Sequence, residues 1–143
     1  MTSDRIRTSF AHPAVTAAGV NHVLLTYHYL DIGDMDGYAS LTETDVTLDH
    51  PGAPPRRGRD AVLRAHTAQA SPLRRHELDT VIADGETIVA LGRVVHSAPG
   101  TADRTPASTD FADVFTLSGQ TLVRACRRYY YAPPPGAQPP SGS

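Results

Sequence analysis

The sequence predicts one α+β domain in which three helices cover one face of a strongly bent sheet. Its first half carries apolar residues at helical spacing, whereas its second half is rich in Val, Ile, Thr and aromatic residues, as strands are. Helices first and strands afterwards are typical of an α+β architecture. The length of 143 residues suits one domain with a single hydrophobic core.

The first part of the chain predicts a hairpin of two helices. Between residues 14 and 32, apolar residues recur every three or four positions, and Gly33 then ends the helix as a C-cap. Residues 34–41 predict a second, short helix capped by Asp34, which lies beside the first because the connection is short. The apolar stripe of the first helix consists of Val20, Val23, Leu24, Tyr27 and Leu30.

A half-buried strand and a third helix follow. Residues 44–49 alternate apolar and polar side chains, and His50 then links this strand to an irregular, proline-rich loop at 51–55. Residues 60–70 predict the third helix, which Pro72 interrupts. One face of this helix carries Val62, Leu63 and His66.

The second half predicts an antiparallel meander of four strands, at 75–83, 87–97, 109–117 and 120–131. Hairpin turns are predicted at Asp84-Gly85 and Ser118-Gly119, and a long polar loop at 98–108. Apolar residues occupy both faces of the second and fourth of these strands. We therefore expect part of the outer face of the sheet to be buried in a homodimer.

The domain is predicted to span residues 14–131. Residues 1–13 are an N-terminal extension, and the proline-rich residues 132–143 are a tail that is not expected to fold. No apolar run approaches the roughly 20 residues that span a bilayer, so no membrane association is expected. The first ten residues lack an export signal, which predicts a cytoplasmic protein.

The composition excludes several classes of function. All 13 basic residues are arginine, which excludes Schiff-base chemistry and the P-loop lysine. The net charge of −2 and the scattered arginines argue against nucleic-acid binding, and Arg56-Arg57-Gly58-Arg59 is interpreted as a solvated loop. The single cysteine, Cys126, excludes an internal disulfide and a Cys-rich zinc site and is expected to be a small buried hydrophobe. No metal site is expected from the scattered histidines.

Four segments carry a resemblance to a known family: YLDIGDMDGY at 29–38, DVTLDHPG at 45–52, PPRRGRD at 54–60 and DFADVFTLSG at 110–119. Together they resemble the nuclear transport factor 2-like superfamily, and more narrowly its ketosteroid isomerases and SnoaL-like polyketide cyclases. The resemblance spans about residues 14–131 and implies a cone-shaped α+β barrel around an apolar pocket. It also implies a cofactor-independent acid–base cyclase or isomerase that acts on an apolar, polyketide-like small molecule in bacterial secondary metabolism.

The resemblance implies two catalytic residues. His50 stands just before a proline, where the isomerases carry their aspartate base, and Asp113 stands at the position of their oxyanion-hole aspartate. The isomerase tyrosine of the first helix aligns with Thr26, and the tyrosine that supports it aligns with His66. Because that first tyrosine is replaced, steroid isomerisation is not expected.

The chemistry of both candidates can be argued from their surroundings. Asp113 lies between Phe111 and Phe115 on one strand face, where desolvation would raise its pKa and keep it protonated as a hydrogen-bond donor. Alternatives are an ionised general base, or a structural carboxylate paired with Arg124 or Arg128. The ordinary histidine pKa of about 6.5 suits His50 for proton abstraction, the alternative being a structural histidine.

Further side chains are predicted to line the substrate pocket: Thr26, Tyr27, Tyr38, His66, His96, Phe111, Phe115 and Tyr129. A tyrosine hydroxyl from Tyr27, Tyr29, Tyr38 or Tyr129 could supply the missing oxyanion donor. Two other functions remain open on the sequence alone. One is a non-catalytic protein that binds or sequesters a small molecule, for example in self-resistance, and the other is a dimeric interaction domain whose cone is filled by side chains.

Overall fold

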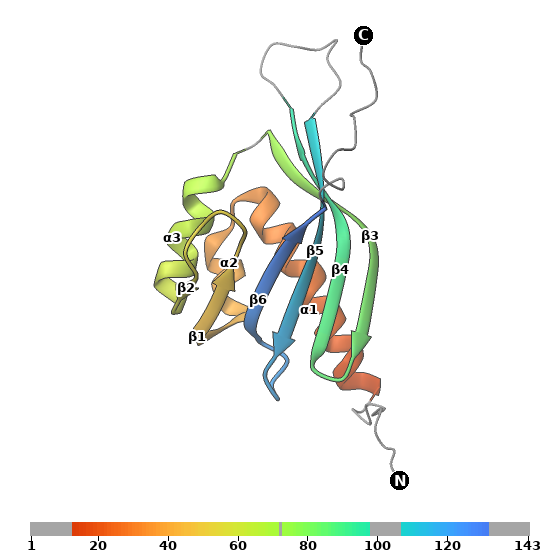
Figure 1. Cartoon of the computed structure of the whole chain (residues 1–143). Coiled ribbons are helices and arrows are strands. Elements are labelled where there is room, and N and C mark those ends of the chain that lie inside the picture. Colours follow the sequence, from red (N-terminus) through yellow and green to blue (C-terminus); the bar gives the residue numbers. More distant parts are fainter. Residues whose placement is uncertain (1–12, 72, 98–106, 132–143) are drawn as a thin grey trace.

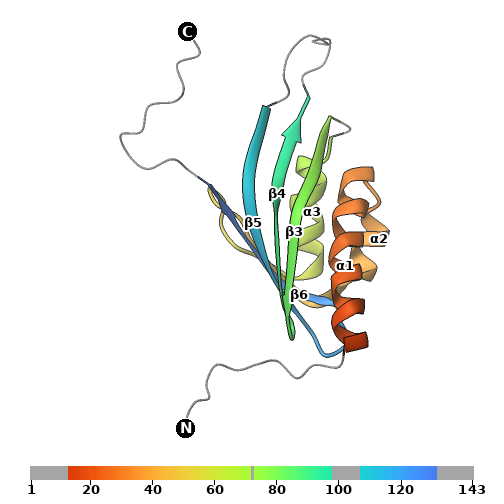
Figure 2. The same ribbon diagram turned by 90° about the vertical axis from the view of Figure 1, so that its right-hand side faces the viewer.

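The computed structural model describes residues 13–71, 73–97 and 107–131. Within them, three helices cover one face of a strongly curved, six-stranded sheet (Figures 1 and 2). This arrangement confirms the predicted α+β cone. The predicted N-terminal extension except residue 13, the predicted tail, and residues 98–106 of the predicted loop lie outside the described residues.

The three helices are α1 (Pro13–Ile32), α2 (Met35–Ser40) and α3 (Arg59–Gln69). Gly33 follows α1 with a φ of 76°, a conformation that favours glycine, and the Asp34 side chain caps α2 by accepting a hydrogen bond from the Gly37 amide at 2.9 Å. On α1, Val23 and Tyr27 are buried. The predicted stripe is wrong at Leu24, which is 41% exposed because it lies one residue, or about 100°, round the helix from Val23.

The sheet has the strand order β2-β1-β6-β5-β4-β3. Only β1 and β6 run parallel, and the other neighbours are antiparallel. The strands are β1 (Thr42–Asp49), β2 (Arg56–Arg57), β3 (Arg74–Asp84), β4 (Thr87–His96), β5 (Ala107–Leu117) and β6 (Val123–Tyr130).

The prediction of a solvated loop at Arg56-Arg57 is wrong, because these residues pair with Thr47 and Leu48 of β1. A two-residue strand has no periodicity from which to predict it.

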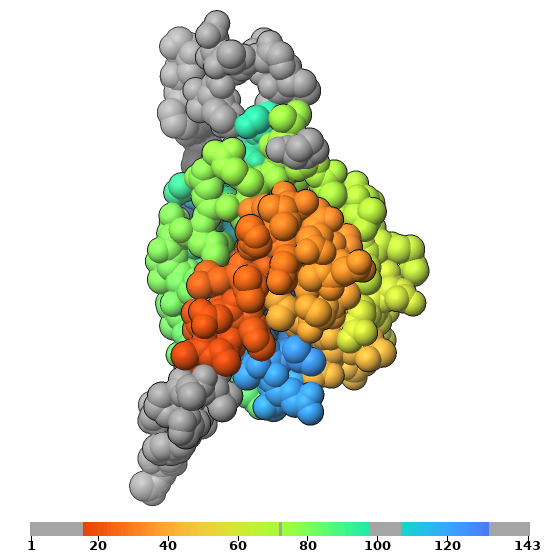
Figure 3. Space-filling model, turned by 180° about the vertical axis from the view of Figure 1, so that it is seen from behind, coloured from red at the N-terminus to blue at the C-terminus, as the bar shows by residue number. Residues whose placement is uncertain are grey.

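The core lies between the helices and the inner face of the sheet. Seen from behind, α1 and α2 form the surface over this face (Figure 3). Alternate residues of β5 point inward, from Phe111 through Asp113 and Phe115 to Leu117, and all four are buried. On α3, Val62 is buried against this core. The helices therefore close the concave side of the sheet around its central strands.

Gly92 marks a close approach of β3 and β4. The register of these strands shifts between Leu78 and Thr80, and Gly92 pairs with Leu78 beside this shift. A Cβ atom added at Gly92 would lie 2.2 Å from the Glu77 carbonyl oxygen and 2.9 Å from the Leu78 Cα. Only glycine fits so near a neighbouring backbone at an irregular point of a sheet.

We expect Gly92→Ala to lower the free energy of unfolding by about 1–3 kcal/mol, because the backbone of β3 must move to admit the methyl group. Chemical denaturation measures this loss. The control is Gly119→Ala, since an added Cβ at Gly119 meets no atom within 4 Å. Equal stability of the two variants would show that the close approach does not constrain the sheet.

Candidate functional site

A narrow pocket lies between the helices and the inner face of the sheet. About 350 Å³ of space lies between its lining atoms when the open mouth is included, but only about 20 Å³ is wide enough to centre a water-sized sphere. A ligand larger than a few water molecules therefore requires lining side chains to move. The lining residues are Thr26, Tyr27, Leu30, Tyr38, Leu48, His50, His66, Arg74, His76, Asp113, Phe115, Cys126 and Arg128.

A buried ion pair between Asp113 and Arg128 forms one wall. The two residues face each other across β5 and β6, and Arg128 donates from Nε to Oδ1 and from Nη2 to Oδ2, both at 2.8 Å. Tyr27 of α1 donates its hydroxyl to Oδ2 of the same carboxylate at 2.5 Å. The guanidinium of Arg128 also lies 4.2 Å from the ring centre of Phe111.

This geometry fits an ionised Asp113. Both carboxylate oxygens accept hydrogen bonds from Arg128, and one also accepts from Tyr27, so the predicted role of a protonated donor finds no support in these contacts. The paired carboxylate is the alternative that the structure favours. Burial raises the pKa of Tyr27, and the charge of Asp113 raises it further. Burial alone would lower the pKa of Arg128, but the hydrogen bonds and charge of Asp113 outweigh it and raise that pKa.

Two histidines, His50 and His66, also line the pocket. His50 follows the last residue of β1, and its ring centre lies 6.2 Å from that of His66 on α3. Nε2 of His66 lies 3.0 Å from the Tyr38 hydroxyl. Burial, assisted by the positive charge of Arg128, lowers the pKa of His50 to about 4. Burial and the neighbouring His50 lower the pKa of His66 to about 3, so both rings are neutral at pH 7.

A third histidine, His76, was not among the predicted site residues. Its Nδ1 lies 2.6 Å from Oδ1 of Asp31, which also accepts hydrogen bonds from the His76 amide. The His76 side chain is 2% exposed and lines the pocket. Burial lowers its pKa against the opposing effect of the Asp31 hydrogen bond, so the ring is neutral. Asp31 then holds the proton on Nδ1 and leaves Nε2 as a proton acceptor.

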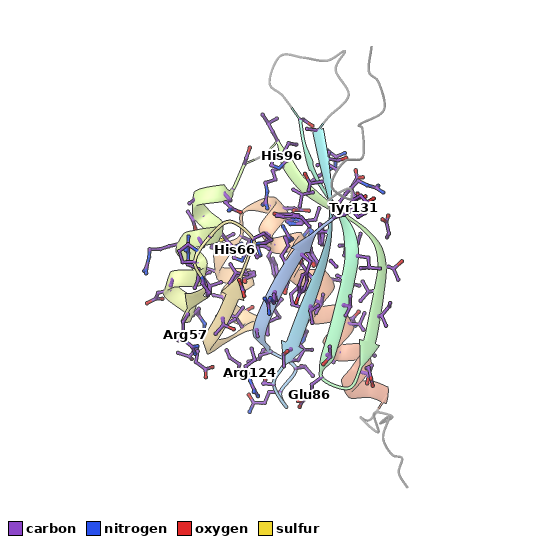
Figure 4. All side chains as sticks on the ribbon, in the orientation of Figure 1. Arg57, His66, Glu86, His96, Arg124 and Tyr131 are labelled. Carbon is purple, nitrogen blue, oxygen red and sulfur yellow. The ribbon has the colours of Figure 1, made fainter. Side chains whose placement is uncertain are left out.

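The structure brings most of the predicted site residues together, including Thr26, Tyr27, Tyr38, His66 and Phe115, but not all of them. Phe111 is buried behind Arg128. His96 lies at the far end of β4, in a separate hollow, whereas His66 lies between α3 and the sheet (Figure 4). Tyr129 is 49% exposed on the outer face, since Arg128 beside it points inward.

Arg74 and His76 were not predicted as site residues from the sequence, and Arg128 was predicted only as a possible partner of Asp113. Strand alternation could have placed all three, because His76 shares the parity of Arg74, and Arg128 the parity of the buried Cys126. What could not be derived was which parity faces the helices. On β3, which carries Arg74 and His76, the inward parity changes at the register shift between Leu78 and Thr80.

A second hollow, of about 300 Å³ including open solvent, adjoins the pocket. Its outer wall is formed by residues of the proline-rich loop, among them Ala53 and Pro54. Both hollows share Leu48, His50 and His66 as lining residues. These three side chains therefore separate the pocket from the second hollow. If they moved aside, the two spaces would join.

Neither metal ligands nor a membrane span emerges from the described part of the chain. No three His, Cys, Asp or Glu side chains within it converge as a metal site requires. None of its helices is both long enough and apolar enough to cross a membrane.

Solved structures share this fold at low sequence identity. A proposed SnoaL-like polyketide cyclase from Jannaschia sp. CCS1 has a TM-score of 0.70 and 14% identity, covering 90% of this chain and 91% of that one. SalBIII, an epoxide hydrolase/cyclase-like enzyme of pyran ring formation in the polyether salinomycin, has a TM-score of 0.69 and 19% identity, with coverages of 80% and 92%. An NTF2-like protein from Anabaena variabilis has a TM-score of 0.70 and 16% identity, with coverages of 90% and 97%.

The sequence itself identifies the family of this chain more specifically than the shared fold does. None of the curated proteins matches this sequence. The SnoaL-like domain, however, matches residues 23–125, which is well over half of the chain and runs from α1 into β6. The chain therefore belongs to the SnoaL-like domain family.

Proposed function

We propose that this protein is an acid–base enzyme that closes a ring in, or isomerises, a polyketide-like small molecule in bacterial secondary metabolism. The observation that carries the proposal is a neutral histidine, His50, in the same pocket as the buried carboxylate of Asp113. Two of the proteins that share the fold, the proposed polyketide cyclase and SalBIII, support the substrate class and the ring closure.

In this proposal His50 accepts a proton from a substrate carbon or hydroxyl and later returns it to another atom of the same molecule. No atom is gained or lost overall, so no co-reactant is needed. The negative charge of Asp113 stabilises the protonated imidazole, because it raises the pKa of His50 against the effects of burial and Arg128. A base with a pKa of about 4 removes only acidic protons, such as the one between two carbonyl groups.

A second candidate function is a non-catalytic binding protein. It is favoured by the narrow interior, of which about 20 Å³ admits a water-sized sphere, and by the hydrogen bonds that occupy Tyr27 and Asp113. Binding needs the pocket but not the proton transfer. The two functions therefore differ in what happens to a bound molecule.

We expect the wild-type protein to accelerate deuterium exchange at the acidic carbon of aromatic β-dicarbonyl compounds in D₂O, measured by proton NMR. His50→Gln should lower the rate by about 10²–10⁴-fold, because it removes the base. His28→Gln is the matched control, since this histidine is exposed on α1, and should keep the wild-type rate.

Two results would contradict the enzymatic proposal. If His50→Gln and Asp113→Asn both keep the exchange rate within about twofold of wild type, neither residue takes part in the proton transfer. Tight binding of the same compounds without exchange would support the binding protein instead.

The neutrality of the buried histidines predicts a loss of stability in acid. Because the pKa of His66 falls from about 6.5 in the unfolded chain to about 3 in the folded one, the unfolded state binds more protons between these values, and stability falls as the pH is lowered through them. Denaturation at about pH 7 and about pH 4.5 should show that His66→Gln loses about 2 kcal/mol less than wild type. His28→Gln should follow wild type; if His66→Gln does so too, the buried ring is not held neutral.

We also propose that the outer face of the sheet pairs with a second copy of the chain. In the described residues no helix covers this face (Figure 2). Ile82 of β3 and Tyr129 of β6 are exposed between inward-facing neighbours, and Tyr131 is exposed just after β6. A shallow hollow beside them includes Leu91 and Ala112. Apolar side chains gathered on one open face indicate a contact surface.

Light scattering after size exclusion tests this pairing. Wild type should have twice the mass of the chain, and Leu91→Glu should be monomeric, because the new carboxylate would be buried without a partner. Ile32→Glu, which changes an exposed residue at the end of α1, should stay dimeric. A monomeric wild type would contradict the proposal.

A further inference from the structure

We propose that the pocket binds the ionised oxygen of an acidic ligand, a carboxylate or an ionised enol, between Arg128 and Arg74. This inference rests on the proposed function to the extent that it requires the pocket to take a ligand. It changes the expected ligand from a wholly apolar molecule to one with an apolar body and an anionic oxygen.

The first support is an unused donor on Arg128. A guanidinium carries five N–H groups, and Arg128 uses Nε and Nη2 on Asp113. Within the described residues its Nη1 is buried and has no hydrogen-bond partner, and the residue as a whole is only 4% exposed. Buried charged donors are almost always satisfied in proteins, so an acceptor is expected beside this nitrogen.

The second support is Arg74, at the start of β3. It lines the pocket together with Arg128, and it also lines the separate hollow that contains His96 and Tyr130. Within the described residues its guanidinium makes no hydrogen bond or ion pair. Burial lowers the pKa of Arg74, and the nearby positive charge of Arg128 lowers it further. An anion between these two arginines would relieve both effects.

The charges of the lining residues also favour an anionic ligand. Only Arg74, Arg128 and Asp113 among them are charged, because the three lining histidines are neutral. Asp113 balances Arg128, which leaves one positive charge. Asp31 of α1 lies outside the lining and bonds to His76, and its charge acts on Arg74 less strongly than that of Arg128 does.

The remaining walls define the rest of the ligand. Leu30, Leu48 and Phe115 are apolar and line the same space. They would pack against a hydrocarbon or aromatic body while the ionised oxygen reaches the arginines. Guanidinium groups suit oxyanions because their N–H groups match the spacing of the two acceptor oxygens of a carboxylate.

Isothermal titration calorimetry with matched probes tests the inference on the full chain. One pair is naphthoate and naphthamide, which differ in charge but little in shape; the other is hydroxynaphthoquinone and its methyl ether. The first pair tests a carboxylate, and the second tests an ionised enol. We expect the acidic member of at least one pair to bind at least about tenfold more tightly than its neutral partner, and added chloride to weaken that preference.

Arg74→Gln should reduce binding of the preferred acidic probe about tenfold and leave its neutral partner within about twofold. Arg75→Gln is the matched control, because the neighbouring side chain is 52% exposed and pairs with Glu77. Arg74 is chosen rather than Arg128 because loss of Arg128 would strand the buried Asp113 and could unfold the protein.

Equal affinity for the acidic and neutral probes, or equal effects of Arg74→Gln and Arg75→Gln, would overturn the inference. So would the failure of every probe to bind. If acidic probes bind as expected but the protein catalyses no proton exchange, the inference stands and the enzymatic proposal fails.

Discussion

The buried pair of Asp113 and Arg128 is the interaction on which the rest of this fold depends. It joins the central strands β5 and β6, and the hydroxyl of Tyr27 ties α1 to the same carboxylate. Loss of one partner from such a pair typically costs about 3–5 kcal/mol, because the other charge stays buried alone. A single carboxylate therefore links two strands and one helix, and an apolar replacement would have to substitute for all three contacts at once.

The same pair sets the electrostatics of the pocket. The positive charge of Arg128 adds to burial in lowering the pKa values of His50, His66 and His76, while the negative charge of Asp113 opposes this at His50. The histidines consequently face the pocket as neutral proton acceptors rather than as cations. An interaction that stabilises the fold thus also determines which protonation states are present for chemistry.

The element order and the inward face of β5 could be predicted from sequence because both depend on local patterns. Asp113 faces the core because Phe111 and Phe115 share its parity. The two-residue strand β2 could not be predicted, since only its pairing with β1 makes it a strand. The pairing of His76 with Asp31 was missed for a similar reason: the residues are 45 positions apart, and a register shift in β3 sets the inward face. His96 and Tyr129 were predicted to line the pocket from their places near the ends of predicted strands, but the strand registers direct them elsewhere.

Structural contacts already occupy several of the polar groups that line the pocket. Tyr27 and both oxygens of Asp113 are occupied by the ion-pair cluster, the Tyr38 hydroxyl by His66, and Nδ1 of His76 by Asp31. Four groups left over among the described lining residues are the His50 ring, Nε2 of His76, Nη1 of Arg128 and the Arg74 guanidinium. Two are proton acceptors and two are cationic donors. Removing a proton from a ligand and holding the resulting negative oxygen needs this combination, whereas an apolar carrier would gain nothing from it and would bear the desolvation cost of both arginines.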